Sequence, residues 1–503
     1  MGMTLKISIF TPIEVPGGVP IKEFRVPPAP EKGVFADIPV DVGPQYEGQR
    51  VRREDMYVEL GGPRIKNKFE LLIIKNLEEV DDGRIAVIGK DLDELEEGKS
   101  YPFSILIEVA GKDLEREAEG VLERRIHEFW NYNEGCMHLN QRYDIWLRIS
   151  KRAVKKGLTS FRYIGTTLYR LFKAAFPVIE KMQITFIIEP EIVQQLYEQA
   201  LKVYEIRDSR VLGLRDEDVD EFYGCKLCQS FAPTHVCVIT PERSANCGAI
   251  TWIDARVAVK IDPKGPIFPI PKGKLLDPIK GEYEGVNESV KKASGGTISR
   301  VCLYTAFDNP HTSCGCFECV AFYIPEVDGL GIVHRGYAGP TPIGLKFGDI
   351  ADAASGGKQL AGFHGLGIVY MRSRKFLQAD GGWSRVVWIT SELKQRVLDA
   401  IPEDLRDKIA TEKDATNVEE LQKFLREKGH PIMQKVIAPA PQAPAPAPVE
   451  QAMPPMEAGG ATQDVGEFTM QSLPLTVGGF RIILKNVKIR AEKIIIKRVE
   501  EKK

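Results

Sequence analysis

The chain has 503 residues, of which 43% are hydrophobic and 27% are charged. This length allows several domains with substantial cores, and the composition is that of an ordinary globular protein. A formal net charge of −2 gives no general attraction to nucleic acid or to an anionic membrane.

No apolar run reaches the roughly 18 residues that a transmembrane helix needs, so no membrane span is expected. Lys6 interrupts the first apolar stretch, where a signal peptide would have an unbroken apolar core. We therefore expect a cytoplasmic protein whose thiols stay reduced.

The predicted elements begin with residues 1–50, which are rich in proline and glycine and contain one candidate strand at 5–10. We interpret this segment as an extended arm. Short apolar runs between 56 and 110 alternate with acidic turns and indicate strands. Residues 158–207 show apolar residues at helical spacing on both sides of a β-rich run at 184–188. A mixed α/β or α+β domain over 51–215 fits this alternation.

A cysteine-rich domain follows over 216–433, with glycine-rich loops at 336–382 and candidate helices near 391–400 and 418–428. Residues 434–475 include APAPQAPAPAP and cannot bury enough apolar surface to fold, which predicts a flexible linker. Residues 476–503 form a short basic segment with candidate strands at 480–487 and 493–499. This tail could dock on a partner subunit or fold back as a small hairpin.

The cysteines are unevenly distributed, because eight of the nine lie between positions 225 and 319. An odd number in a large protein of a reducing compartment argues against a disulfide framework, and clustered thiols there are more often metal ligands. The nine are Cys136, Cys225, Cys228, Cys237, Cys247, Cys302, Cys314, Cys316 and Cys319.

Four of them follow the spacing C-x2-C-x8-C-x9-C, namely Cys225, Cys228, Cys237 and Cys247. A Cys-x2-Cys turn lets two thiolates reach the same metal or the same cluster face. Four thiolates suit either tetrahedral zinc or a 4Fe–4S cluster. Zinc ribbons use two C-x2-C pairs, whereas only Cys225 and Cys228 form such a pair here. The spacing therefore favours an iron–sulfur cluster and leaves zinc open.

A second element, Ser-Cys-Gly-Cys at 313–316, predicts a different chelate. The thiolates of Cys314 and Cys316 and the backbone nitrogens of Gly315 and Cys316 can surround one metal in a square. Square-planar nitrogen–sulfur donors suit Ni(II) or Cu(II). Glycine has no Cβ to obstruct a chain that wraps flat around a metal. The motif is a weak signal alone and a stronger one beside a four-cysteine set.

Three stretches resemble acetyl-CoA synthase together: CKLCQSFAPTHVCVITPE at 225–242, SCGCFE at 313–318, and GLKFGDIADAASGGKQLAGFHGLG at 344–367. Because a large N-terminal domain is absent, the form that is most similar is the archaeal subunit of the acetyl-CoA decarbonylase/synthase complex. The resemblance covers about residues 55–433. It implies an α+β or mixed α/β chain of two main domains, followed by the linker and the short β segment.

The resemblance also implies roles for single residues. Cys225, Cys228, Cys237 and Cys247 would hold a 4Fe–4S cluster, and Cys228 would also bridge to a proximal nickel. Cys314 and Cys316 would bridge this nickel to a distal nickel, which the amides of Gly315 and Cys316 would complete. Phe231 would lie over the proximal nickel and shape its open position, although a phenylalanine is more often ordinary core.

The implied reaction joins carbon monoxide and a methyl group at nickel and transfers the product to the thiol of coenzyme A. The implied partners are carbon monoxide dehydrogenase subunits, a corrinoid iron–sulfur protein that donates the methyl group, and a ferredoxin-type electron carrier. The alternative is a non-enzymatic subunit in which the four cysteines between Cys225 and Cys247 hold structural zinc or an electron-transfer cluster. The Cys-Gly-Cys motif separates the two, because neither a zinc nor an electron-transfer site needs a square-planar chelate.

The other candidates have simpler interpretations. Cys136 and Cys302 are expected to be buried thiols, and Cys319 departs from the family pattern and could be a core residue. His235 and His311 lie near ligand cysteines but are more often structural. The glycine-rich segment 336–382 has no phosphate-binding motif, so we expect it to build loops near the cluster or coenzyme A.

Overall fold

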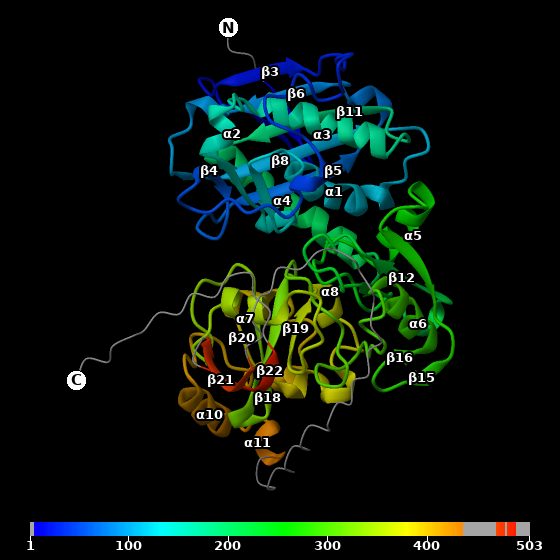
Figure 1. Cartoon of the computed structure of the whole chain (residues 1–503), viewed down its shortest axis with the longest axis vertical. Coiled ribbons are helices and arrows are strands. Elements are labelled where there is room, and N and C mark those ends of the chain that lie inside the picture. The colour runs from blue at the N-terminus through cyan, green and yellow to red at the C-terminus, as the bar shows by residue number, and fades with distance from the viewer. Residues whose placement is uncertain (1–4, 436–468, 478–479, 489–503) are drawn as a thin grey trace, which may run out of the picture. The chain divides into compact units, whose positions relative to one another are not determined.

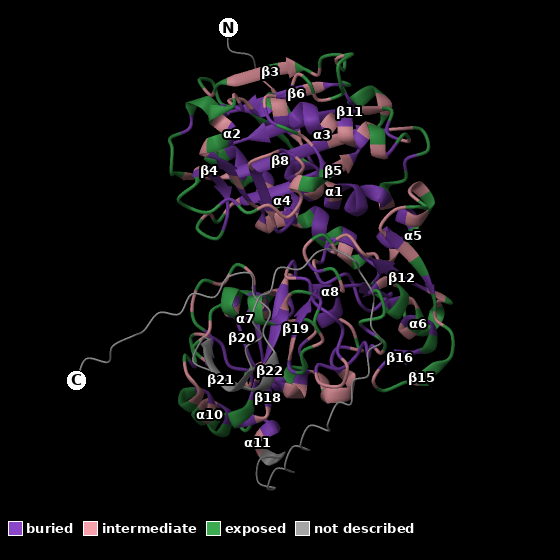
Figure 2. Ribbon diagram, in the orientation of Figure 1, coloured by how far each residue is buried: buried purple, intermediate pink, exposed green. Residues whose placement is uncertain are grey.

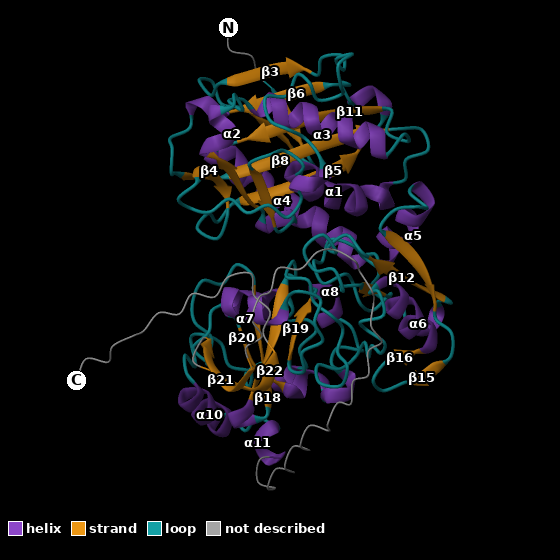
Figure 3. Cartoon of the chain, in the orientation of Figure 1, coloured by secondary structure: helices purple, strands orange, loops and turns teal. Residues whose placement is uncertain are grey.

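The computed structural model describes residues 5–435, 469–477 and 480–488, with side chains for 5–433. The chain divides into two compact units, Met1–Ala440 and Pro441–Lys503. Helices and several mixed sheets make up the first unit, which confirms the α+β class (Figures 1 and 3). The predicted boundary between 215 and 216 stays a prediction. Within the described residues, no helix is long and apolar enough to cross a membrane.

A five-stranded mixed sheet organises residues up to 215, with the order β3-β6-β11-β8-β5 (Figure 1). A second sheet has the order β7-β4-β10-β9, and β1 pairs with β2. The strands are β1 (Lys6–Ser8), β2 (Pro12–Glu14), β3 (Ile21–Arg25), β4 (Met56–Gly61), β5 (Lys68–Ile74), β6 (Arg84–Ile88), β7 (Ser100–Tyr101), β8 (Phe103–Ala110), β9 (Cys136–Leu139), β10 (Trp146–Ser150) and β11 (Lys181–Ile187). The helices are α1 (Glu119–Asn131), α2 (Lys151–Lys155), α3 (Phe161–Ala175) and α4 (Pro190–Ser209).

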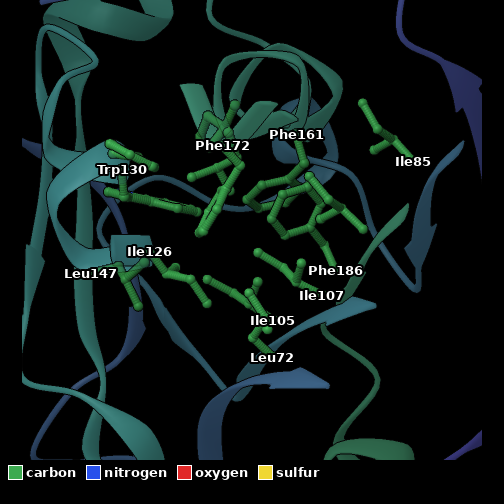
Figure 4. Packing of buried hydrophobic residues seen from close by; sticks show 14 of the residues in the cluster. Leu72, Ile85, Ile105, Ile107, Ile126, Trp130, Leu147, Phe161, Phe172 and Phe186 are labelled. Atoms are coloured by element: carbon green, nitrogen blue, oxygen red, sulfur yellow. The ribbon is translucent and has the colours of Figure 1, made fainter. Parts of the chain in front are cut away.

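Helix α3 follows from its sequence pattern. The Ser160 hydroxyl caps its first turn by accepting a hydrogen bond from the Arg162 amide at 3.2 Å. Its apolar residues at helical spacing are buried against the sheet, as predicted. Figure 4 shows Phe161 and Phe172 in this core with Phe186 of β11. The buried residues of this stripe are Phe161, Ile164, Leu168 and Phe172. Burying each large side chain contributes about 1.5–3 kcal/mol, so the stripe fixes the helix on the sheet.

The segment 5–50, predicted as an arm, contributes three short strands. Strand β3 adds to the edge of the five-stranded sheet by pairing antiparallel with β6. Ile7 and Ile13 of the β1–β2 pair are buried in a core that also contains Leu196 of α4. The apolar residues of the segment therefore take part in the main core.

The cysteine-rich part has one sheet of order β13-β12-β14 and one of order β19-β17-β18-β20. Its strands are β12 (Glu221–Cys225), β13 (Cys237–Ile239), β14 (Ile267–Pro271), β15 (Leu275–Asp277), β16 (Glu282–Tyr283), β17 (Cys319–Ile324), β18 (Gly329–His334), β19 (Phe363–Leu366) and β20 (Val386–Ile389). Its helices are α5 (Trp252–Ile261), α6 (Glu284–Ala293), α7 (Phe347–Ala354), α8 (Ile368–Met371), α9 (Ser391–Arg396), α10 (Val418–Glu427) and α11 (Ile432–Lys435). The central strands of these sheets are buried (Figure 2).

The second unit contains β21 (Thr469–Val477) paired antiparallel with β22 (Phe480–Lys488). Strand β22 matches the candidate strand at 480–487. Strand β21 begins inside the stretch predicted as linker, where the sequence LPLTV already alternates apolar residues in the strand pattern. Most of that linker, 436–468, and the candidate strand at 493–499 lie outside the described residues.

Candidate metal centre

Strand pairing brings the first cysteines of the site together. Strand β12 ends at Cys225 and β13 begins at Cys237, and the two residues are opposite each other in the antiparallel register. The intervening residues form tight turns, in which the amides of Phe231 and Ala232 both donate to the Cys228 carbonyl, at 3.3 and 2.9 Å. The half-buried Phe231 therefore lies beside Cys228.

The six candidate sulfurs lie in two neighbouring groups. Cys225 and Cys237 pack in one buried cluster, with the half-buried Cys247 against it. Cys228, Cys314 and Cys316 pack in another, which Phe231 borders. The side chain of Cys228 packs against those of Cys314 and Cys316. Interactions with the Cys228 and Cys314 side chains lower the pKa of Cys316 below that of an ordinary thiol, whereas burial raises the pKa of Cys225 to about 12.

The Cys-Gly-Cys loop is held in a conformation that only glycine adopts readily. Gly315 has a φ of 117°, and the Cys316 amide points at the Cys314 sulfur, 3.3 Å away. The Arg335 guanidinium donates through Nε to the Phe317 carbonyl at 3.0 Å and through Nη2 to the Gly315 carbonyl. These two contacts hold the loop in this conformation.

The glycine-rich segment braces the loop, as the loop-building interpretation expected. The Gly357 amide donates to the Ser313 carbonyl at 2.8 Å, and the Gly365 amide donates to the Ser313 hydroxyl at 2.6 Å. A Cβ on Gly357 would lie 2.4 Å from the Thr234 hydroxyl, so this close approach requires glycine. These contacts join segments that are more than 40 residues apart in the chain.

A buried arginine faces the sulfurs. Arg124 of α1 is 1% exposed, and its Nη2 lies 3.6 Å from the Cys228 sulfur. Within the described residues it forms no ion pair with a carboxylate, and its Nη1 has no hydrogen-bond partner. Burial opposes its charge, but the sulfurs of Cys228 and Cys247 outweigh this effect and raise its pKa. Sequence analysis missed Arg124, because it is about 100 residues from the motif and no spacing links the two.

This arginine allows a test of whether the donor set fits a metal centre. A permanently charged group that is fully buried requires a negative partner. Burial raises the pKa of Cys225 and Cys237, and of the sulfurs near Arg124 only that of Cys316 has a lowered pKa, so thiols alone would compensate Arg124 only in part. A centre held by thiolates supplies the missing negative charge. The residues therefore fit an anionic metal–thiolate group.

The arrangement differs from a site for one ion. Within the part of the chain that the structure describes, no three His, Cys, Asp or Glu side chains are arranged to hold a single metal ion. A tetrahedral zinc needs four ligands around one point, whereas a cluster binds each thiolate at a separate iron. Cys228 packs with the Cys-Gly-Cys loop and not with Cys225 and Cys237.

The remaining sequence candidates add no further sulfur to the two groups. Both nitrogens of His311 are used, since Nε2 accepts from the Val238 amide at 2.8 Å and Nδ1 bonds the Thr312 carbonyl at 2.7 Å. His235 contacts the Cys237 sulfur at 3.1 Å, and burial lowers its pKa to about 4, so it is a neutral structural partner. The buried cysteines that the site does not bring in are Cys136, Cys302 and Cys319.

Two cavities meet at the Cys-Gly-Cys loop. One of about 550 Å³ is bordered by Cys247 and Cys316 and by more basic than acidic side chains: Arg64, Lys66, Lys68, Arg142, Arg335 and Arg396 against Asp144, Glu318 and Glu392. The other, about 520 Å³, is bordered by the whole loop and by Phe231, Phe347 and Ala351. Sequence analysis missed the basic set, because its members are scattered over more than 300 residues and only the fold gathers them.

Comparisons with known proteins agree along most of the chain. Residues 38–193 match the family described as CO dehydrogenase/acetyl-CoA synthase complex beta subunit, and residues 204–437 match the family described as the C-terminal part of the ACS/CODH beta subunit. The beta 2 subunit of the acetyl-CoA decarbonylase/synthase complex from Methanocaldococcus jannaschii is 54% identical, over 92% of this chain and 97% of its own. The beta subunit from Methanothermobacter thermautotrophicus is 52% identical, over 92% of this chain and 100% of its own. A solved C-terminal domain of an acetyl-coenzyme A synthase alpha subunit is 42% identical over 24% of this chain and 96% of its own, with a TM-score of 0.22.

Proposed function

Because this chain belongs to the family of acetyl-CoA decarbonylase/synthase beta subunits, we propose that its two groups of cysteines hold a 4Fe–4S cluster joined to two nickel ions. The family gives the chain a catalytic role in making or cleaving acetyl-CoA. The finer proposal is a CO-methylating acetyl-CoA synthase, an acyltransferase. The observation that carries it is the contact of Cys228 with Cys314 and Cys316 beside a buried cation that needs negative charge.

Different cysteines of the chain would bind different parts of this group. Cys225, Cys237 and Cys247, with Cys228, would bind the iron cluster. Cys228 is also in contact with the Cys-Gly-Cys loop, which supports its proposed bridging position. Cys314 and Cys316, with the amide nitrogens of Gly315 and Cys316, would bind nickel. When bound, the group supplies a soft nickel centre at which carbon monoxide, a methyl group and a thiol can be combined.

The two cavities support separate roles for the rest of the site. Coenzyme A carries several phosphate charges, and the cavity beside Cys247 and Cys316 has the basic border that such a ligand needs. Lys66 is exposed there and forms no ion pair with another described residue, so its charge is available to a phosphate. The other cavity has Phe231 and Phe347 on its border, and these apolar rings would exclude water from the loop and limit which small ligands approach.

The experiment that tests this proposal is metal analysis of anaerobically purified protein. We expect about two nickel and four iron atoms per chain, in keeping with the proposed cluster. One zinc per chain without nickel would instead support the non-enzymatic zinc subunit, and four iron without nickel would support an electron-transfer subunit.

The proposed partners follow from the substrates of this reaction. Carbon monoxide dehydrogenase subunits would supply CO, a corrinoid iron–sulfur protein would supply the methyl group, and a ferredoxin-type carrier would supply electrons, all in the cytoplasm. Truncation at Ala438 should leave nickel and iron content unchanged but weaken co-purification of these partners. Unchanged co-purification would refute a tethering role for residues 438–503.

A further inference from the structure

The side chain of Arg335 contacts the Cys-Gly-Cys loop at the two carbonyls that flank Cys316. Its Nη2 donates to the Gly315 carbonyl, and its Nε donates to the Phe317 carbonyl at 3.0 Å. A guanidinium is a rigid planar fork, so two donors on one side chain fix the relative orientation of the two peptides they contact.

This contact determines which way the peptide between Gly315 and Cys316 faces. In a trans peptide the C=O and the N–H point in opposite directions. With its oxygen on Arg335, the peptide turns its nitrogen away, and the Cys316 amide indeed points at the Cys314 sulfur, 3.3 Å distant. The nitrogen therefore faces the Cys314 thiol, and the Cys314 and Cys316 side chains both pack with Cys228.

We propose that Arg335 is the positioning residue of the metal-binding loop, which it holds with the Cys316 nitrogen and both thiols facing one point. This inference rests on the proposed function. A peptide nitrogen that binds a metal carries negative charge, which it shares with the carbonyl oxygen of the same peptide. The guanidinium donates to that oxygen and so stabilises the metal-bound form by charge as well as by geometry.

The fold holds Arg335 in place from several sides. Strands β17 and β18 pair with Cys319 opposite His334, and the Arg335 amide donates to the Glu318 carbonyl at 3.0 Å. The guanidinium lies over the ring of Phe347, 5.2 Å from its centroid. Its side chain is 18% exposed, and the nearest carboxylate is only at 3.9 Å. Its Nη1 also donates to the Asn140 side-chain oxygen. Arg335 is therefore held from both sides and directs two of its three side-chain hydrogen bonds to the loop.

Arg385 provides a matched control in the same part of the chain. Its side chain is also 18% exposed, it forms an ion pair with Asp328, and it lies over the ring of Phe307 at 5.1 Å. It borders neither of the two cavities at the loop. Arg385→Met should remove the same positive charge and a similar stacking contact as Arg335→Met, without disturbing the loop.

The test adds Ni(II) anaerobically to full-length protein that contains iron but no nickel, and compares wild type, Arg335→Met, Arg335→Lys and Arg385→Met. The readouts are the absorption band of planar Ni(II) and the rate at which a chelator removes the metal. We expect Arg335→Met to lose nickel about 10- to 100-fold faster, as for other residues that orient metal ligands, with iron content unchanged. Arg335→Lys keeps the charge but not the fork and should be intermediate, and Arg385→Met should behave as wild type.

The outcomes separate this inference from the proposed function. If wild type shows no planar Ni(II) band, both fail. If wild type shows the band and Arg335→Met keeps it with the same release rate, only the role of Arg335 is refuted. Should Arg335→Met not fold, Arg335→Lys decides the matter, because release at the wild-type rate from this variant would refute the two-carbonyl fork.

Discussion

Replacing Arg124 by methionine should change stability in opposite directions with and without metal. At an effective dielectric constant of about 20, a full negative charge at the Cys228 sulfur, 3.6 Å away, attracts the guanidinium by about 4–5 kcal/mol. Without metal, the pKa of Cys228 lies above that of an ordinary thiol, because of its contacts with Cys314 and Cys316 and its burial, so this attraction is missing while the desolvation cost of the cation remains. Cys316, whose pKa is lowered, remains as a weaker negative partner. Arg124→Met should therefore raise the melting temperature of the metal-free protein and lower that of the loaded protein.

The assay is thermal unfolding of both forms at neutral pH under anaerobic conditions. Arg125 is the matched control, because it is the next residue of α1 and has a carboxylate partner, Glu128, at 2.9 Å. Arg125→Met should lower the stability of both forms by a similar amount. If Arg124→Met does the same, the argument that the sulfurs carry the compensating charge is wrong.

Three further changes test other parts of the site and fold. Cys316→Ser should remove nickel while the iron–sulfur absorbance remains, because the four proposed cluster ligands are intact; retention of most nickel and activity would refute the chelate. Phe231→Ala should keep the metal content but alter inhibition by CO, and unaltered inhibition would count against a gating role. Because the ring is only half-buried, the variant should lose less stability than the roughly 3–5 kcal/mol expected for a core phenylalanine. Burial lowers the pKa of His430 to about 4, so the unfolded chain binds more protons than the folded chain between pH 6.5 and 4. The free energy of unfolding should therefore fall as the pH drops through this window, and it should fall less steeply in His430→Gln. Equal slopes of the two proteins in urea unfolding would contradict the assignment.

The local features of the site depend on neighbours in the chain, so the sequence bears on them directly. The turn that places Phe231 beside Cys228 and the glycine conformation at position 315 are both decided within a few residues. The stripe of α3 was predictable for the same reason, since its burial follows from helical periodicity.

The features that the sequence did not reveal depend on distant contacts. Arg124 and Arg335 reach the sulfurs and the loop only because helix α1 and the β17–β18 pair place them there. A single arginine has no periodicity or spacing that distinguishes it from the others in the chain. The same holds for the basic border of the larger cavity, whose members come from both halves of the first unit.

The position of Cys316 and Arg335 on the border of both cavities has a consequence for kinetics. A bulky thiol ester and a diatomic gas would reach the same loop through different entrances, so neither needs to leave before the other arrives. Under the proposed function, initial-rate patterns should then be of random order, and coenzyme A should not compete with CO.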